Sequence, residues 1–195
     1  MGLVRIVGGS LGGRRLRVSK EGVRPTSERI REAMFDILGA ERLLGARVLD
    51  LYAGTGALGI EALSRGAESV DFFEGNPMVA RLLGENLRAF GLIDRGRVHV
   101  TDLDRMELPA SAAGQWSLAF LDPPYEGDAG ARWIHALSRG WRLAPGGILI
   151  YERRKDTVIT HPAALTLATE RTYGDTTVAI YRVGDQPKQS EGGGV

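Results

Sequence analysis

The residues best suited to chemistry in this chain surround a glycine-rich turn. Asp50 ends an apolar run, and Gly54 and Gly56 follow it just before a second apolar run. Glycine at a turn between a strand and a helix permits a left-handed backbone and lets a ligand approach the main chain closely. The turn therefore predicts a nucleotide-cofactor site. With Gly59 it also satisfies the G-x-G-x-x-G pattern of dinucleotide enzymes, so a nicotinamide oxidoreductase remains an alternative.

Carboxylates end three successive predicted strands, at Asp50, Glu74 and Asp102. A dinucleotide would bring its pyrophosphate close to Asp50, and like charges a few ångströms apart cost about 1 kcal/mol or more even when screened. S-adenosylmethionine instead carries an ammonium and a sulfonium. Asp50 can accept hydrogen bonds from the ammonium, Glu74 from both ribose hydroxyls, and Asp102 from the adenine amino group. Each acid alone could be a helix cap or a solvated loop residue, but the three together favour S-adenosylmethionine as the cofactor.

A second candidate site is the tetrapeptide Asp122-Pro123-Pro124-Tyr125, which follows the fourth apolar strand. Two prolines fix φ and remove two donors, which leaves rigidly held carbonyl acceptors. The Asp122 side chain and the Pro123 carbonyl could accept both protons of a conjugated amino group and direct its lone pair at a methyl carbon. Tyr125 offers a flat face to a base turned out of its stack. A plain rigid turn is the alternative, but beside the glycine turn and the strand-end acids the tetrapeptide predicts methylation of a base amino group.

The elements that must position these residues alternate between strand and helix. Apolar strand-like runs lie at 47–52, 69–74, 97–102, 117–122, 146–152, 164–173 and 176–183. Helical patterns separate most of them, and Gly174 and Asp175 separate the last two. This pattern predicts an α/β, Rossmann-like fold with a mostly parallel sheet and an antiparallel closing pair. The stripe Met78, Leu82, Leu83 and Leu87 predicts a helix face in the core.

Positive charge is concentrated at the N-terminus. The first 31 residues hold eight Lys and Arg against two Glu, whereas the whole chain has 25 basic and 24 acidic residues. Runs at 3–7 and 14–18 around a glycine-rich centre predict a β-hairpin, and Ser27 begins a helical pattern that ends near Gly39. A solvated basic arm is one explanation; a phosphate-binding surface is the other, because backbone charge dominates nucleic-acid affinity. The candidate RNA-binding residues are Arg5, Arg14, Arg15, Arg17 and Arg24.

Length and composition predict one main domain. We expect a basic hairpin appendage at 1–25, the cofactor-binding domain at 26–184 and a disordered tail at 185–195. The chain has no cysteine, and its start lacks the apolar core of a signal peptide, so we expect a cytoplasmic protein without membrane association. Its three histidines are scattered without metal-ligand spacing, so we expect no metal.

The chain resembles the class I methyltransferases, and more closely the RsmD-type small-subunit ribosomal RNA guanine-N2 methyltransferases of bacteria. The resemblance spans residues 3 to about 182 and rests on RIVGGSLGGRRL, RPTSERIREAMFDIL, LDLYAGTGALGIEALSRGA, the Glu74 strand end, DPPY and YGDTTVAIYR. DNA adenine and cytosine methyltransferases and a protein-glutamine methyltransferase group share the glycine turn and DPPY. The two N-terminal segments are therefore the more discriminating ones.

The resemblance implies a seven-stranded sheet and methyl transfer to N2 of a guanine in 16S ribosomal RNA, within the small subunit or an assembly intermediate of it. Arg24 would reach an RNA phosphate. Relatives commonly have a Trp and a basic residue where this chain has Leu11 and Gly12, which predicts weaker RNA contact at the hairpin tip. The cofactor site would comprise Asp50, Tyr52, Gly54, Gly56, Glu74, Asp102 and Thr26, and the catalytic residues would be Asp122, Pro123 and Tyr125.

Other functions stay open at this point. The nearest is methylation of DNA or another RNA at adenine N6 or cytosine N4, although so short a chain leaves no separate domain to recognise a duplex sequence. A protein-glutamine methyltransferase would leave the basic N-terminus unexplained. An inactive RNA-binding module would have no need of the strand-end acids or of DPPY.

Overall fold

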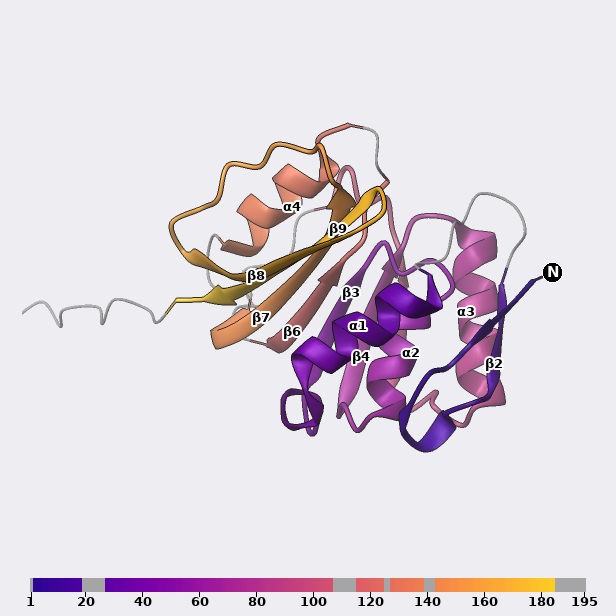
Figure 1. The fold of residues 1–195 in the computed structure, drawn as a ribbon. Coiled ribbons are helices and arrows are strands. Elements are labelled where there is room, and N and C mark those ends of the chain that lie inside the picture. The colour runs from indigo at the N-terminus through magenta and orange to yellow at the C-terminus, as the bar shows by residue number, and fades with distance from the viewer. Residues whose placement is uncertain (1, 19–26, 107–114, 125–126, 139–142, 185–195) are drawn as a thin grey trace, which may run out of the picture.

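The computed structural model describes residues 2–18, 27–106, 115–124, 127–138 and 143–184, and a seven-stranded sheet lies at its centre (Figure 1). The strand order is β5-β4-β3-β6-β7-β9-β8; the first five are parallel, and β9 is antiparallel to both neighbours. This arrangement confirms the predicted fold. The strands are β3 (Arg47–Leu51), β4 (Ser69–Glu74), β5 (Gly96–Val100), β6 (Trp116–Leu121), β7 (Leu143–Arg154), β8 (Leu165–Tyr173) and β9 (Thr176–Val183).

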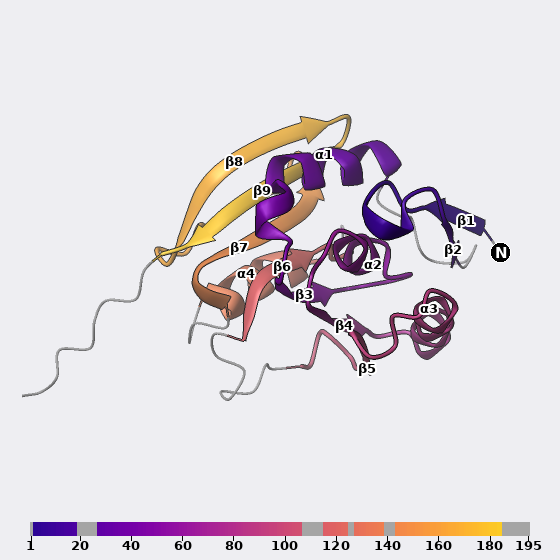
Figure 2. The same ribbon diagram turned by 90° about the horizontal axis from the view of Figure 1, so that it is seen from below.

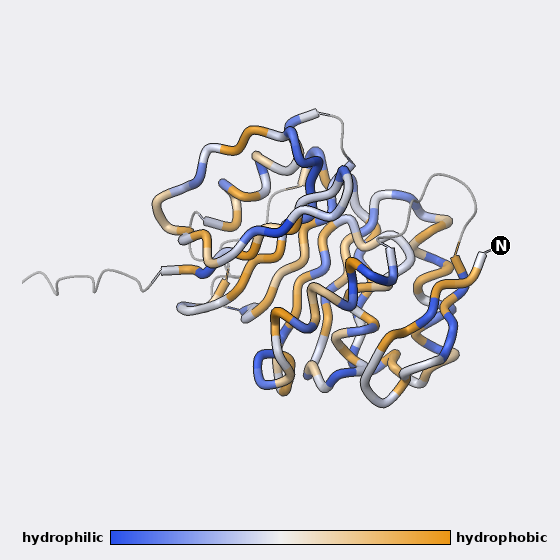
Figure 3. Tube along the Cα trace, viewed as in Figure 1, coloured by the Kyte–Doolittle hydropathy of each residue, from blue (hydrophilic) through white to orange (hydrophobic). Residues whose placement is uncertain are grey.

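Helices pack on both faces of the sheet, so the core has two parts. Apolar residues of α1, α2 and α3 belong to one buried cluster with one face of the strands, and those of α4 belong to a second cluster with the other face. Figure 2 shows α1, α2 and α3 on the same side, and Figure 3 shows hydrophobic residues gathered along the central strands. The helices are α1 (Glu28–Leu38), α2 (Ala57–Ser64), α3 (Pro77–Ala89) and α4 (Ala129–Ser138).

Local capping explains where the amphipathic helices begin and end. The Ser27 hydroxyl accepts a hydrogen bond from the Ile30 amide at 3.3 Å, and Gly39 ends α1 with a φ of 74°. At the start of α3 the Asn76 side chain accepts from the Met78 amide at 2.9 Å, and Pro77 occupies the first helical position. Such caps satisfy amides that have no partner within the helix. The helix predicted after Ser27 is confirmed.

The N-terminal hairpin is a separate two-stranded sheet, β1 (Gly2–Arg5) and β2 (Arg15–Val18), joined through a short 3-10 turn. It is not a free arm, because its apolar residues Ile6, Leu11 and Leu16 are buried in the same cluster as α2. Asn86 of α3 also pairs with β2: its side chain accepts from the Arg17 amide at 3.0 Å and donates to the Arg17 carbonyl at 2.9 Å. The hairpin is thus fixed to the body of the protein.

The domain limits remain a prediction, because residues 19–26 and 185–195 lie outside the described residues. In the part of the chain that the structure describes, every helix is too short or too polar to cross a membrane.

Candidate active site

The carboxyl ends of three neighbouring strands bring the predicted site residues to one edge of the sheet. Leu51 of β3 pairs with Phe73 of β4 on one side and with Leu121 of β6 on the other. The segments that follow these residues, with Tyr52, Glu74 and Asp122, therefore leave the sheet side by side. Open α/β sheets bind ligands in the crevice at this edge.

The turn after β3 is tight and left-handed at three positions. Tyr52 has a φ of 59°, Gly54 a φ of 53° and Gly56 a φ of 77°. Only glycine adopts this conformation at low cost, so Tyr52 carries backbone strain of the kind found at functional sites. A Cβ on Gly56 would lie 2.2 Å from Leu83 of α3. The turn therefore requires glycine for space as well as for conformation.

Glu74 holds this turn in place. One of its carboxylate oxygens accepts from the Gly54 amide at 2.8 Å, and the other accepts from the Asn76 amide at 2.7 Å. A carboxylate has about four lone-pair positions, so each oxygen can still accept from a ribose hydroxyl. The same side chain can therefore shape the turn and bind a ligand there.

Asp50 lies beneath the turn and is almost fully buried, with 2% of its surface exposed. One oxygen accepts a hydrogen bond from the Gly59 amide in the first part of α2 at 3.0 Å. Burial raises the pKa of Asp50 to about 7; the Gly59 hydrogen bond opposes this rise and the negative charge of Glu74 adds to it. A cation bound at the turn would favour the ionised form, which suits a ligand that carries an ammonium.

Asp102 lies just beyond β5 and is exposed. It accepts from the Asp104 amide at 3.0 Å and forms an ion pair with Arg105 at 3.4 Å. The Tyr52 hydroxyl reaches the same turn and donates to the Asp104 carboxylate at 3.3 Å. Burial raises the pKa of Tyr52, so its hydroxyl remains a donor at neutral pH. Asp104 thus links Tyr52 and Asp102, the two predicted cofactor residues of this part of the site.

Asp122 leaves β6 directly after Leu121 and is half-buried, while Pro123 is buried and Pro124 is exposed. Prolines donate no backbone hydrogen bond, so these two positions can offer only acceptors from the main chain. A cavity of about 180 Å³ lies beside both prolines and is also bordered by the start of α4 and the end of β7. Tyr125 and Thr26, which the sequence assigns to the site, lie outside the described residues.

The candidate RNA-binding arginines do not all lie in equivalent positions. Arg5 and Arg15 are cross-strand partners, as are Leu3 and Arg17, so Arg5, Arg15 and Arg17 share the outer face of the hairpin. Arg5 also pairs with Glu28 at 3.0 Å. Arg14 points elsewhere: its guanidinium lies over the Phe90 ring and donates to the Ala89 carbonyl at the end of α3. Arg24 lies outside the described residues.

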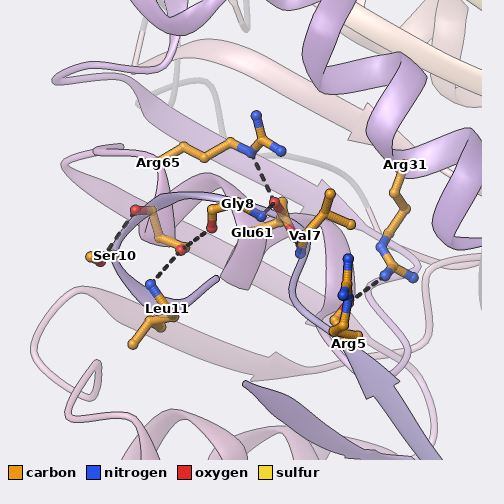
Figure 4. A network of polar contacts seen from close by, with 9 residues as sticks. Arg5, Val7, Gly8, Ser10, Leu11, Arg31, Glu61 and Arg65 are labelled. Atoms are coloured by element: carbon orange, nitrogen blue, oxygen red, sulfur yellow. Dashed lines mark hydrogen bonds and ion pairs between the residues drawn. The ribbon is translucent and has the colours of Figure 1, made fainter. Parts of the chain in front are cut away.

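Glu61 of α2 anchors the hairpin, and sequence reasoning missed it (Figure 4). This carboxylate is fully buried. It accepts from the Val7 and Gly8 amides, each at 2.7 Å, and from the Arg65 guanidinium at 2.8 Å. Ser64 adds a second link, because its hydroxyl donates to the Gly8 carbonyl. The available signal was a single acid within the otherwise apolar run ALGIEAL, since buried carboxylates need donors.

Within the described ranges, no group of three His, Cys, Asp or Glu residues is placed to hold a metal ion.

Comparison with known proteins gives consistent matches over most of the chain. The family model described as conserved hypothetical protein 95 matches residues 4–182. Ribosomal RNA small subunit methyltransferase D from Haemophilus influenzae is 33% identical over 184 residues, which cover 93% of this chain and 94% of that protein. A methyltransferase structure from Escherichia coli is 32% identical, with 95% of this chain and 100% of that chain covered and a TM-score of 0.82.

A more distant structure shares the fold alone. It is an RNA methyltransferase from Salinibacter ruber, solved in complex with S-adenosyl-L-homocysteine. The two sequences are 14% identical, and the structural match covers 85% of this chain and 97% of the other, with a TM-score of 0.64.

Proposed function

The chain belongs to the family described as conserved hypothetical protein 95, together with ribosomal RNA small subunit methyltransferase D, and from this membership we propose that it methylates small-subunit ribosomal RNA with S-adenosylmethionine. The methyl group goes to the exocyclic N2 of a guanine in 16S RNA, in the small subunit or an assembly intermediate of it. The reaction takes place in the cytoplasm, where such particles are assembled.

One observation carries this proposal: the glycine turn, Glu74 and Asp122 lie at the same sheet edge, at the ends of adjacent strands. The residues fit S-adenosylmethionine, because Glu74 can accept from ribose hydroxyls while it holds Gly54. The buried Asp50 carboxyl suits an ammonium better than a pyrophosphate. When bound, S-adenosylmethionine supplies a methyl group made electrophilic by its sulfonium. The oxidoreductase alternative would place a dianionic pyrophosphate beside Asp50.

The protein's own groups supply orientation and electrostatic stabilisation. The Asp122 carboxylate and the Pro123 carbonyl accept the two amino protons of the guanine, which turns the nitrogen lone pair away from the ring. The negative charge of Asp122 also stabilises the positive charge that develops on nitrogen as it forms its new bond to carbon. That nitrogen then loses one proton to Asp122 or to solvent, which leaves a neutral N2-methylguanine. Tyr125, next in sequence, provides the stacking face.

The outer face of the hairpin binds the RNA, because Arg5, Arg15 and Arg17 lie together there. From Arg14 to Arg17 the chain enters β2 and runs from the end of α3 back towards its start. The start of α3 follows Glu74 at the edge of the sheet where the site lies. RNA that follows this strand is thereby led towards the site. Phosphate contacts of this kind position a nucleic acid without reading its sequence.

The test is transfer of tritium from labelled S-adenosylmethionine to small ribosomal subunits that lack their modifications. Wild-type protein should label 16S RNA as N2-methylguanine. Asp122→Ala should abolish the label, whereas Asp94→Ala, which removes an exposed acid before β5, should not. Label on another base, on DNA or on protein would reject the substrate, and absence of both transfer and cofactor binding would reject the proposal as a whole.

A further inference from the structure

The cavity beside Pro123 and Pro124 contains a tyrosine hydroxyl that the reaction scheme above does not use. Tyr151 of β7 and Gly130 of α4 both line this space of about 180 Å³. A cavity of about 150 Å³ accommodates benzene in an engineered protein, so the volume here is sufficient for a planar ring. Because the cavity adjoins the segment after Asp122, a base held by that segment would extend into it.

Tyr151 is almost fully buried, with 3% of its surface exposed. Its hydroxyl forms no hydrogen bond with any residue in the described part of the chain. The hydroxyl oxygen is not one of the fully buried polar atoms without a partner among the described residues, so it is accessible from the cavity. It can therefore donate a hydrogen bond to a molecule bound there.

Gly130 shows that the fold makes room for this hydroxyl. A Cβ at position 130 would lie 1.9 Å from the Tyr151 hydroxyl oxygen, so any other residue would displace it. Gly130 is the second residue of α4, and its lack of a side chain leaves the hydroxyl room at the edge of the cavity. An alanine at this position would push the hydroxyl away from the place where it meets the cavity.

We propose that the Tyr151 hydroxyl donates a hydrogen bond to O6 of the target guanine and so selects guanine among bases that carry a 2-amino group. The inference rests on the proposed function, since it requires guanine N2 to be held at Asp122 and Pro123. N2 and O6 lie at opposite ends of the same base edge, so the second contact fixes the orientation of the ring as well as its identity.

The surroundings of the hydroxyl favour donation. Burial raises the pKa of Tyr151, so the phenol keeps its proton at neutral pH. The positive charge of Arg153, which also lines the cavity, acts on the same phenol. A cation on one side favours the orientation in which the oxygen faces it and the hydrogen points away.

The experiment compares guanine with 2-aminopurine, which keeps the 2-amino group and lacks O6. Small subunits are reconstituted with 16S RNA that carries either base at the nucleotide methylated by the wild type. For Tyr151→Phe we expect kcat/KM on guanine to fall about tenfold, as for the loss of one neutral hydrogen bond, while kcat/KM on 2-aminopurine stays within about twofold. The preference for guanine should therefore fall about tenfold as well.

Tyr181→Phe is the matched control. The Tyr181 hydroxyl of β9 forms no hydrogen bond with the described residues either, but it is fully buried and Tyr181 does not line the cavity. This variant should keep the wild-type preference, and both variants should keep the wild-type affinity for S-adenosylhomocysteine. If Tyr151→Phe slows both substrates equally or leaves both unchanged, the inference is wrong although the proposed function stands. If the wild type methylates no guanine, the proposed function fails and the inference fails with it.

Discussion

Replacement of Glu61 by glutamine should loosen the hairpin and weaken RNA binding. One oxygen of Glu61 accepts from the Gly8 amide and from Arg65, and the other accepts from the Val7 amide. A glutamine keeps only one acceptor oxygen, so its amide nitrogen would face a backbone donor. One buried amide without a partner costs about 1–3 kcal/mol, and Arg65 loses its charged partner. We expect a total destabilisation of about 2–4 kcal/mol for Glu61→Gln.

Urea unfolding measures this change, and affinity for small ribosomal subunits gives a second readout. Glu85→Gln is the control, because it removes an exposed i,i+4 partner of Arg81, and such surface pairs contribute about 0.5 kcal/mol or less. A loss of under about 0.5 kcal/mol for Glu61→Gln, with normal particle binding, would refute the assignment of Glu61 as the hairpin anchor.

Three further predictions concern the turn and the basic face. Burial raises the pKa of Asp50 from 3.8 to about 7, so the folded state binds this proton more tightly than the unfolded state does. The free energy of unfolding, compared with that of Asp50→Asn, should therefore rise as pH falls from about 7 towards 4. Urea unfolding should show a rise of up to about 4 kcal/mol. Gly59→Ala would place a Cβ 2.2 Å from the Phe72 ring, and overpacking of about 1–3 kcal/mol should appear as a lower Tm and weaker binding of S-adenosylhomocysteine. Replacing Arg15 and Arg17 together by glutamine should weaken particle binding at low salt and reduce the slope of log K against log salt by about 1–2, with cofactor affinity unchanged.

The sequence was sufficient to predict the fold and the edge at which the site residues meet. Strand and helix periodicity, the cap at Ser27 and the glycine turn are local signals. Neighbouring parallel strands end at the same edge of the sheet, so residues at their carboxyl ends must lie close together. Met78 is the exception: its spacing predicted a core position, but it is 81% exposed. Met78 lies in the first turn of α3, where the next residues Val79 and Ala80 are already buried, so Met78 lies beside the buried face of the helix and not on it.

Contacts between distant segments could not be predicted. Glu61 meets Val7 and Gly8 across more than fifty positions, and nothing local indicates which amides will approach a buried acid. The same holds for Tyr151 and Gly130, since only the packing of α4 on β7 brings the hydroxyl to a residue without a side chain. Such pairs depend on tertiary packing, which has no periodic signature in the sequence.

The shortness of α2 has a consequence for how this protein can change over evolution. The amide of Gly59 contacts Asp50 under the cofactor turn, and two residues later Glu61 holds the hairpin. An α-helix rises about 1.5 Å and turns about 100° per residue, so one inserted or deleted residue between them would rotate Glu61 out of reach of the hairpin. The spacing between the glycine turn and the hairpin is therefore a fixed length, and this segment should tolerate substitutions far better than changes in its number of residues.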